Sequence, residues 1–167
     1  VAVGVAAVEI VGDRVARTAV LVGQRHSGGE DDRHDVRRAV AELGTEEQAR
    51  TALAPFASEP ERFGAVAWGE KRAHAERPGL STTFEGGVLR GEKSYVTNFD
   101  RAASLVVFAQ SQVNEGWSGI DAYLVDPKSV TLGERATTLG LDAASFGSLR
   151  LDGAKGERLS RYEVGTP

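Results

Sequence analysis

Residues 91–98, which read GEKSYVTN, decide the fold of this chain. Apolar runs flank them, FEGGVL (84–89) on one side and FDRAASLVVFAQ (99–110) on the other. Glycines between apolar runs are typical of a hairpin. The hairpin does not by itself explain why an aromatic residue, a hydroxyl and an amide follow one another at the end of the stretch.

Strand geometry gives these residues a possible second role. In a strand, Tyr95 and Thr97 share one face, while Val96 points the other way. A flat aromatic ring beside a hydroxyl can stack on a planar heterocycle and hydrogen-bond to it, and Asn98 suits the turn that follows. From the spacing alone, a plain strand that ends in an Asn turn is the better explanation of the stretch.

The chain after about residue 60 consists of short β-type runs separated by glycine, asparagine, aspartate and proline. These runs are GAVAW (64–68), TTF (82–84), GVLRG (87–91), KSYVTN (93–98), SLVVFAQS (104–111), IDAYLVD (120–126) and SLRLDG (148–153). Several such runs at short spacing predict an antiparallel β-barrel or sandwich.

The first sixty residues have a helical pattern instead. Apolar residues recur at steps of three and four in two stripes, the first formed by Val5, Val8, Val11, Val15, Ala19 and Val22 and the second by Val36, Val40 and Leu43. Residues 26–35 between them are predicted to be a loop. Gly44 suits a helix C-terminus, Thr45 and Gln48 form a capping box for a further helix, and that helix is expected to fray near Pro55. We therefore predict an α+β protein with a partial α-helical domain (1–60) and a β-domain (61–167).

Composition narrows the classes of function. Apolar residues make up 41% of the chain and the formal net charge is −4, so a packed core is expected and a basic nucleic-acid surface is not. The chain has no cysteine, which fits a cytoplasmic protein. Its apolar opening stretch is interrupted by Glu9 and is too short to span a bilayer, so no membrane role is expected. The chain also has no methionine, which predicts that the true N-terminus lies upstream.

Several other groups of residues admit both a functional and a plain interpretation. The acidic and histidine-containing stretch with His26, Glu30, Asp31, Asp32, His34 and Asp35 is better explained as a solvated loop than as a metal site. His74 lies in a charged stretch, and no nucleophile motif supports a hydrolase. Lys71, Arg72, Arg77 and Arg90 can hold an anion, but a surface patch is the better explanation of these charges. Trp68, Trp117 and Tyr123 are expected to be packing aromatics.

The order of the motifs resembles the acyl-CoA dehydrogenase family over residues 35–153. The matching pieces are GTEEQ (44–48), FGAVAWGE (63–70), VLRGEKSYVTN (88–98), AASLVVFAQS (102–111), GIDAYLVD (119–126) and LGLDAASFGSLRLDG (139–153). The family's L-x-G-x-K-x-[WY]-[IV]-[TS]-N pattern makes GEKSYVTN the most specific piece. The resemblance implies part of the family's N-terminal helical domain followed by its middle β-domain.

The resemblance also implies a cofactor and its contacts. Family members bind FAD and oxidise acyl-CoA thioesters. By this likeness Tyr95 lies against the isoalloxazine ring and Thr97 hydrogen-bonds to its edge. Trp68, Gly69 and Glu70 are then expected at the strand end on the pyrimidine side of the flavin.

The sequence departs from the family pattern on the phosphate side. Gly69 replaces a threonine, and His74 and Ala75 replace a glycine–serine pair, so a side chain stands where backbone is expected to approach the ligand closely. Asp142 and Ala144 replace an arginine and a serine, and Ser145 lies one place later.

Two functions remain open on this basis. The family's catalytic glutamate lies in a C-terminal helical domain that the sequence after Asp152 does not match, so no catalytic base is assigned here. One hypothesis is a subunit that completes an FAD site for an acyl thioester oxidoreductase within a homo- or hetero-oligomer, with an acyl-CoA dehydrogenase-like partner supplying the base. The alternative is a non-catalytic binding or scaffolding module that has lost FAD.

Overall fold

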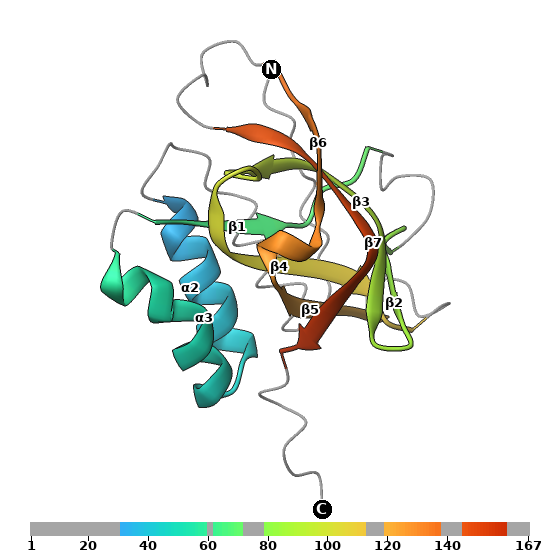
Figure 1. Cartoon of the computed structure of the whole chain (residues 1–167). Coiled ribbons are helices and arrows are strands. Elements are labelled where there is room, and N and C mark those ends of the chain that lie inside the picture. Colours follow the sequence, from blue (N-terminus) through green and yellow to red (C-terminus); the bar gives the residue numbers. More distant parts are fainter. Residues whose placement is uncertain (1–30, 60–61, 72–78, 113–118, 138–144, 160–167) are drawn as a thin grey trace, which may run out of the picture.

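The computed structural model describes residues 31–59, 62–71, 79–112, 119–137 and 145–159, and the structural statements below concern these ranges (Figure 1). Two helices precede seven strands, which confirms the predicted α+β class. The helices are α2 (Asp31–Leu43) and α3 (Glu46–Ser58), and the strands are β1 (Phe63–Ala67), β2 (Thr83–Glu85), β3 (Val88–Thr97), β4 (Ala102–Gln110), β5 (Ile120–Val125), β6 (Thr131–Arg135) and β7 (Phe146–Arg158). A 3-10 turn, η2 (Pro127–Ser129), joins β5 to β6.

Helix α2 starts earlier than the sequence pattern predicts. Residues 31–35 belong to the helix and not to a loop, so the predicted loop over 26–35 is wrong for this part. The helix ends before Gly44, whose N–H donates to the Val40 carbonyl (2.8 Å).

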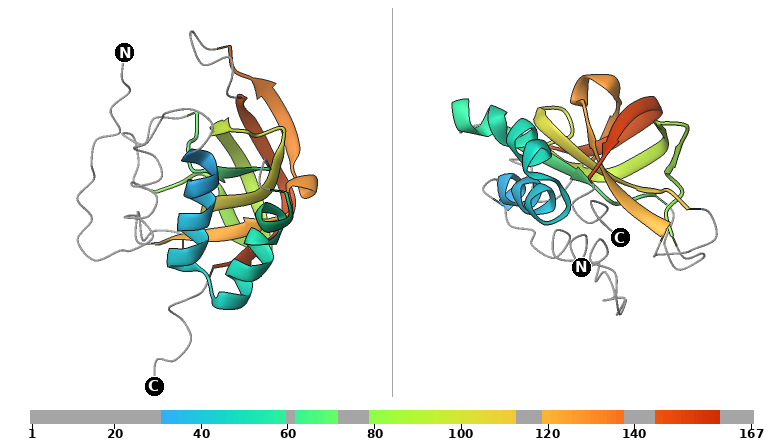
Figure 2. Two further views of the ribbon diagram at one scale, coloured as in Figure 1. Left: turned by 90° about the vertical axis from the view of Figure 1, so that its left-hand side faces the viewer. Right: turned by 90° about the horizontal axis from the view of Figure 1, so that it is seen from below.

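The capping box of α3 is confirmed. The Thr45 hydroxyl accepts from the Gln48 N–H (3.2 Å), and the Gln48 side chain accepts from the Thr45 N–H (3.0 Å). The helix ends at Ser58, shortly after Pro55, as predicted. Both helices lie on one side of the strands (Figure 2). Their buried residues form one core with β4 and β5, made of Val36, Ala39, Val40, Leu43, Ala52, Phe56, Leu80, Val106, Phe108, Ile120, Ala122 and Leu159.

The strands form a closed ring. Its order is β4–β2–β3–β7–β5, and β5 pairs back onto β4. Strand β1 joins the ring on β4, and β6 joins it on β7. The β1–β4 and β2–β4 pairings are parallel, so the expectation of a purely antiparallel sheet is wrong at β4. The connection from β1 to β4 contains the β2–β3 hairpin, and a connection of this length allows the chain to re-enter in the same direction.

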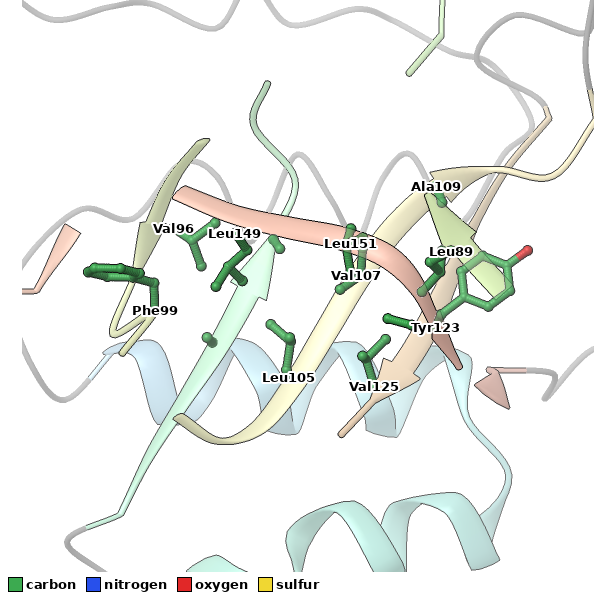
Figure 3. Close-up of a cluster of buried hydrophobic side chains, with 13 residues drawn as sticks. Leu89, Val96, Phe99, Leu105, Val107, Ala109, Tyr123, Val125, Leu149 and Leu151 are labelled. Carbon is green, nitrogen blue, oxygen red and sulfur yellow. The ribbon is translucent and has the colours of Figure 1, made fainter. Parts of the chain in front are cut away.

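The interior of the ring is apolar over most of its length (Figure 3). The residues that fill it include Leu89, Val96, Phe99, Leu105, Val107, Ala109, Tyr123, Val125, Leu149 and Leu151. Tyr123 is fully buried and stacks on Phe84 (4.2 Å between ring centroids), which confirms its packing role. Trp117 lies outside the described residues.

Candidate functional site

A β-bulge in β3 displays Tyr95. Lys93 pairs with Leu149 and Val96 with Gly147, so Ser94 and Tyr95 together face the single residue Ser148. Tyr95 has φ 58°, a left-handed conformation that costs a bulky residue about 1–3 kcal/mol. Its side chain is nevertheless 69% exposed. The backbone is strained here, and the aromatic ring is not buried in return.

Alternation resumes directly after the bulge. Val96 is buried in the barrel, while Thr97 is half-buried on the other face. Asn98 ends the strand in the predicted turn, with φ 55°; its N–H donates to the Ser145 carbonyl (2.6 Å) and its side-chain oxygen accepts from Arg101 (2.9 Å). The strand therefore presents a tyrosine and a threonine on its outer side, two residues apart.

The segment after β1 lies against this bulge. The Gly69 carbonyl accepts from the Ser94 N–H (2.8 Å), and a Cβ on Gly69 would stand 2.8 Å from the Ser94 carbonyl oxygen. Glycine at this position therefore permits the close approach of the two backbones. In the same segment, the Trp68 ring packs edge-on against Phe108 (5.1 Å between centroids). The fold thus brings residues 68–70 next to the strand segment that carries Tyr95.

A buried ion pair lies directly behind the bulge. The Lys93 Nζ donates to Glu70 Oε1 (2.9 Å) and to the Trp68 carbonyl (3.2 Å). The side chain of Lys93 is 0% exposed and that of Glu70 is 7% exposed. Burial alone would raise the pKa of Glu70, but the Lys93 ammonium and the hydrogen bonds to the carboxylate lower it to about 2. Burial lowers the pKa of Lys93 to about 8, although Glu70 opposes this shift.

The Glu70 carboxylate also holds the chain beyond residue 79. Its Oε2 accepts from the Ser81 N–H (2.7 Å) and its Oε1 from the Thr82 N–H (2.9 Å). The same segment is held from β4, because the Gln110 side chain accepts from the Leu80 N–H (3.1 Å) and the Gln110 N–H donates to the Thr82 carbonyl (2.8 Å). Both ends of the 71–80 connection are therefore fixed.

This ion pair was not predicted from the sequence. A signal for it does exist, because Leu89, Gly91 and Lys93 alternate with exposed residues and share the inward face of β3. A lysine at an inward position requires a buried acidic partner. Glu70 was expected at the flavin, and its carboxylate has three protein partners in the structure.

The remaining candidates are less concentrated. Lys71 pairs with Glu92 on the surface (3.1 Å), which raises the pKa of Lys71. Ser145 is buried and donates to Asp100 (2.5 Å). Several residues of the sequence argument lie outside the described residues: His26, Glu30, Arg72, His74, Ala75, Arg77, Asp142 and Ala144. Residues 31–35 of the acidic stretch lie in α2, and no metal-binding group of three or more His, Asp or Glu side chains occurs within the described ranges.

The described residues form an α+β fold, with two helices packed on a closed β-ring. An exposed aromatic residue, Tyr95, stands at a bulge of this ring. Comparison with known proteins identifies the chain as an acyl-CoA dehydrogenase-like segment, which confirms the resemblance drawn from the sequence. It is 32% identical over 116 residues, 66% of the chain, to the mitochondrial short-chain specific acyl-CoA dehydrogenase of Bos taurus. It is 29% identical over 118 residues to a subunit of the caffeyl-CoA reductase–Etf complex of Acetobacterium woodii.

Solved structures agree with this assignment. An FAD-dependent dehydrogenase matches 73% of the chain with 30% identity and a TM-score of 0.63. The butyryl-CoA dehydrogenase of Megasphaera elsdenii covers 90% of the chain at 21% identity with a TM-score of 0.63, and it supports the fold alone. The chain spans only 28% to 31% of the length of these curated relatives and 35% to 43% of these two solved chains. No model of a known protein family matches the sequence.

Among the described residues, no helix has the length and apolar character needed to cross a membrane.

Proposed function

We propose that this chain supplies the ring-facing part of a flavin site in an FAD-dependent oxidoreductase of acyl thioesters. The observation that carries the proposal is Tyr95, a largely exposed aromatic residue held in a strained left-handed conformation at a bulge. Strain of this kind concentrates at ligand sites, where the surrounding structure enforces it. The match to acyl-CoA dehydrogenases covers this strand.

The residues present fit a planar ring on this face. The Tyr95 ring is free to stack on a heterocycle, and the Thr97 hydroxyl can donate to or accept from its polar edge. Gly69 allows the backbone of the 68–70 segment to lie close against the bulge, so this segment stands beside the strand residues that carry Tyr95. The Glu70 carboxylate holds this segment from behind. When bound, FAD would accept the hydride removed from the acyl chain.

The base for the proposed reaction comes from elsewhere in the assembly. No described residue is placed as the base that removes the α-proton, so we assign that base to a further segment or to a partner subunit related to the acyl-CoA dehydrogenases. A related protein is named as a subunit of a complex, which supports an oligomeric arrangement. A cytoplasmic location and an acyl-CoA or other acyl thioester substrate belong to the same proposal.

A non-catalytic binding or scaffolding role is the second candidate. It is favoured by His74 and Ala75, which replace the small residues expected on the phosphate side. It is also favoured by the engagement of Glu70 with protein groups, which leaves one predicted cofactor contact to act only indirectly. The packed core and the closed ring serve a scaffold equally well.

The visible absorption spectrum separates the two candidates. The purified chain, alone or with candidate partner subunits, is expected to carry flavin absorption, and this absorption should bleach on addition of an acyl-CoA when the segment or subunit that supplies the base is present. Tyr95→Ala and Thr97→Ala should shift the flavin spectrum, whereas Lys128→Ala, an exposed change in η2, should not. Protein that takes up no FAD in any complex would favour the scaffold.

A further inference from the structure

We propose that Glu70 and Lys93 are positioning residues that fix the face carrying Tyr95. Their buried pair joins the three chain segments around the bulge and so determines where the Tyr95 ring meets a planar ligand. This inference rests on the proposed function, because it assumes that Tyr95 faces such a ligand.

The Lys93 side chain connects the bulge to the segment that follows β1. Lys93 immediately precedes the bulge, and its ammonium contacts Trp68 and Glu70, the two neighbours of Gly69. Gly69 in turn accepts from the Ser94 N–H. The Lys93 side chain therefore binds the residues on both sides of Gly69, whose carbonyl is hydrogen-bonded to the bulge. If Lys93 releases the segment, the Gly69–Ser94 hydrogen bond loses its support.

The Glu70 carboxylate extends this connection to the segment that contains Ser81 and Thr82. Its hydrogen bonds to the Ser81 and Thr82 amides add a third segment to the two that Lys93 joins. All three segments meet behind the bulge, and the Thr82 carbonyl also accepts from the Gln110 N–H of β4. These hydrogen bonds therefore fix the position of the bulge relative to β4 and the rest of the barrel.

Stability alone does not explain why a charged pair occupies this position. A buried ion pair is often no more stabilising than apolar residues of similar size, so stability alone gives it little advantage. Directed hydrogen bonds do specify one arrangement of their partners, and a strained residue persists only where its surroundings over-determine it. Tyr95 is the strained residue, and the Glu70–Lys93 pair lies directly behind it.

The test uses the full chain, with FAD as the probe and amide hydrogen exchange as a readout independent of flavin. Glu70→Gln and Lys93→Met are expected to weaken FAD binding by about 10- to 100-fold, the scale of a small misplacement of binding groups. They should also shift the spectrum of bound flavin and speed exchange of the Ser94 amide. Ser104→Ala is the matched control, because it removes a buried hydrogen bond from β4 to the Ala52 carbonyl of α3 (2.8 Å), at a strand position that pairs with Gly64 and not with the bulge. It should lower stability without these effects.

The double variant Glu70→Gln/Lys93→Met guards against misfolding, because it leaves no unpaired buried charge. It is expected to fold and still to bind FAD weakly. Binding equal to that of the unaltered chain, with unchanged Ser94 exchange, would overturn the positioning role. If the unaltered chain binds no FAD, the flavin proposal fails separately, and Ser94 exchange alone decides: faster exchange in the variants supports positioning, and unchanged exchange overturns it.

Discussion

Tyr95 combines two properties that rarely occur together, a left-handed backbone and an exposed aromatic side chain. Glycine tolerates this conformation because it has no Cβ to crowd the backbone. Asparagine tolerates it because its side chain can hydrogen-bond locally and offset part of the cost. A β-branched residue carries two heavy atoms on Cβ instead of one, and this crowding raises the cost of the left-handed conformation. Substitutions at this position can therefore separate backbone strain from the loss of the ring.

We expect Tyr95→Asn to be tolerated and Tyr95→Val to be destabilising. The difference in the free energy of unfolding should be about 1–2 kcal/mol in favour of asparagine, because only valine adds branching at a left-handed position. Urea unfolding measures it. The same pair of substitutions at exposed Glu92, an ordinary strand residue, should reverse the order, since valine suits a strand better. Equal stabilities of the two Tyr95 variants would show that the bulge relaxes.

The ion pair behind the bulge gives a second prediction at the residue scale. Lys93→Met should lower the free energy of unfolding by about 3–5 kcal/mol, because it leaves the Glu70 carboxylate buried without its counter-charge. The double variant with Glu70→Gln should cost less than the sum of the single changes, which a double-mutant cycle in urea measures. Additive costs would mean that the two charges do not interact.

The elements differ in how much of their structure the sequence determines. The capping box at Thr45 and the glycine after α2 are local signals, and both were predicted correctly. The start of α2 and the parallel pairings of β4 were not, because they depend on packing and on connections between distant segments. The site divides in the same way. The two-residue spacing of Tyr95 and Thr97 predicted that they share one face of the strand. Only the fold reveals that residues 70, 81–82 and 93 meet.

The cap of α3 can be tested as an element on its own. Thr45→Ala should lower the free energy of unfolding by about 1 kcal/mol, because the Gln48 N–H loses its side-chain acceptor. Thr51→Ala, an exposed change inside the same helix, should be neutral or slightly stabilising, since alanine is the better helix former. Thermal unfolding of both variants measures the contrast, and an equal loss in both would assign the effect to composition and not to the cap.

At the scale of the whole molecule, Glu70 links stability to pH. Its pKa is about 2 in the folded chain and 4.5 as an ordinary carboxyl group, so the unfolded chain takes up a proton first as the pH falls. The stabilisation from Glu70 is therefore complete above pH 4.5 and is lost between pH 4.5 and about 2. Urea unfolding at stepped pH should show the unaltered chain approaching Glu70→Gln in stability over this window. A gap that stays constant in acid would contradict the shifted pKa.

The closed ring also constrains the order in which the protein can be completed during synthesis. Strand β7 pairs with β3, β5 and β6, and without it β3 and β5 have no strand between them. A nascent chain that has released only the first six strands therefore holds open edges on β3 and β5, where stray pairing can occur. The barrel closes only after residue 158 has left the ribosome. Stalling translation just before β7 should leave a chain that is protease-sensitive and prone to aggregate, and release of β7 should end both properties in one step.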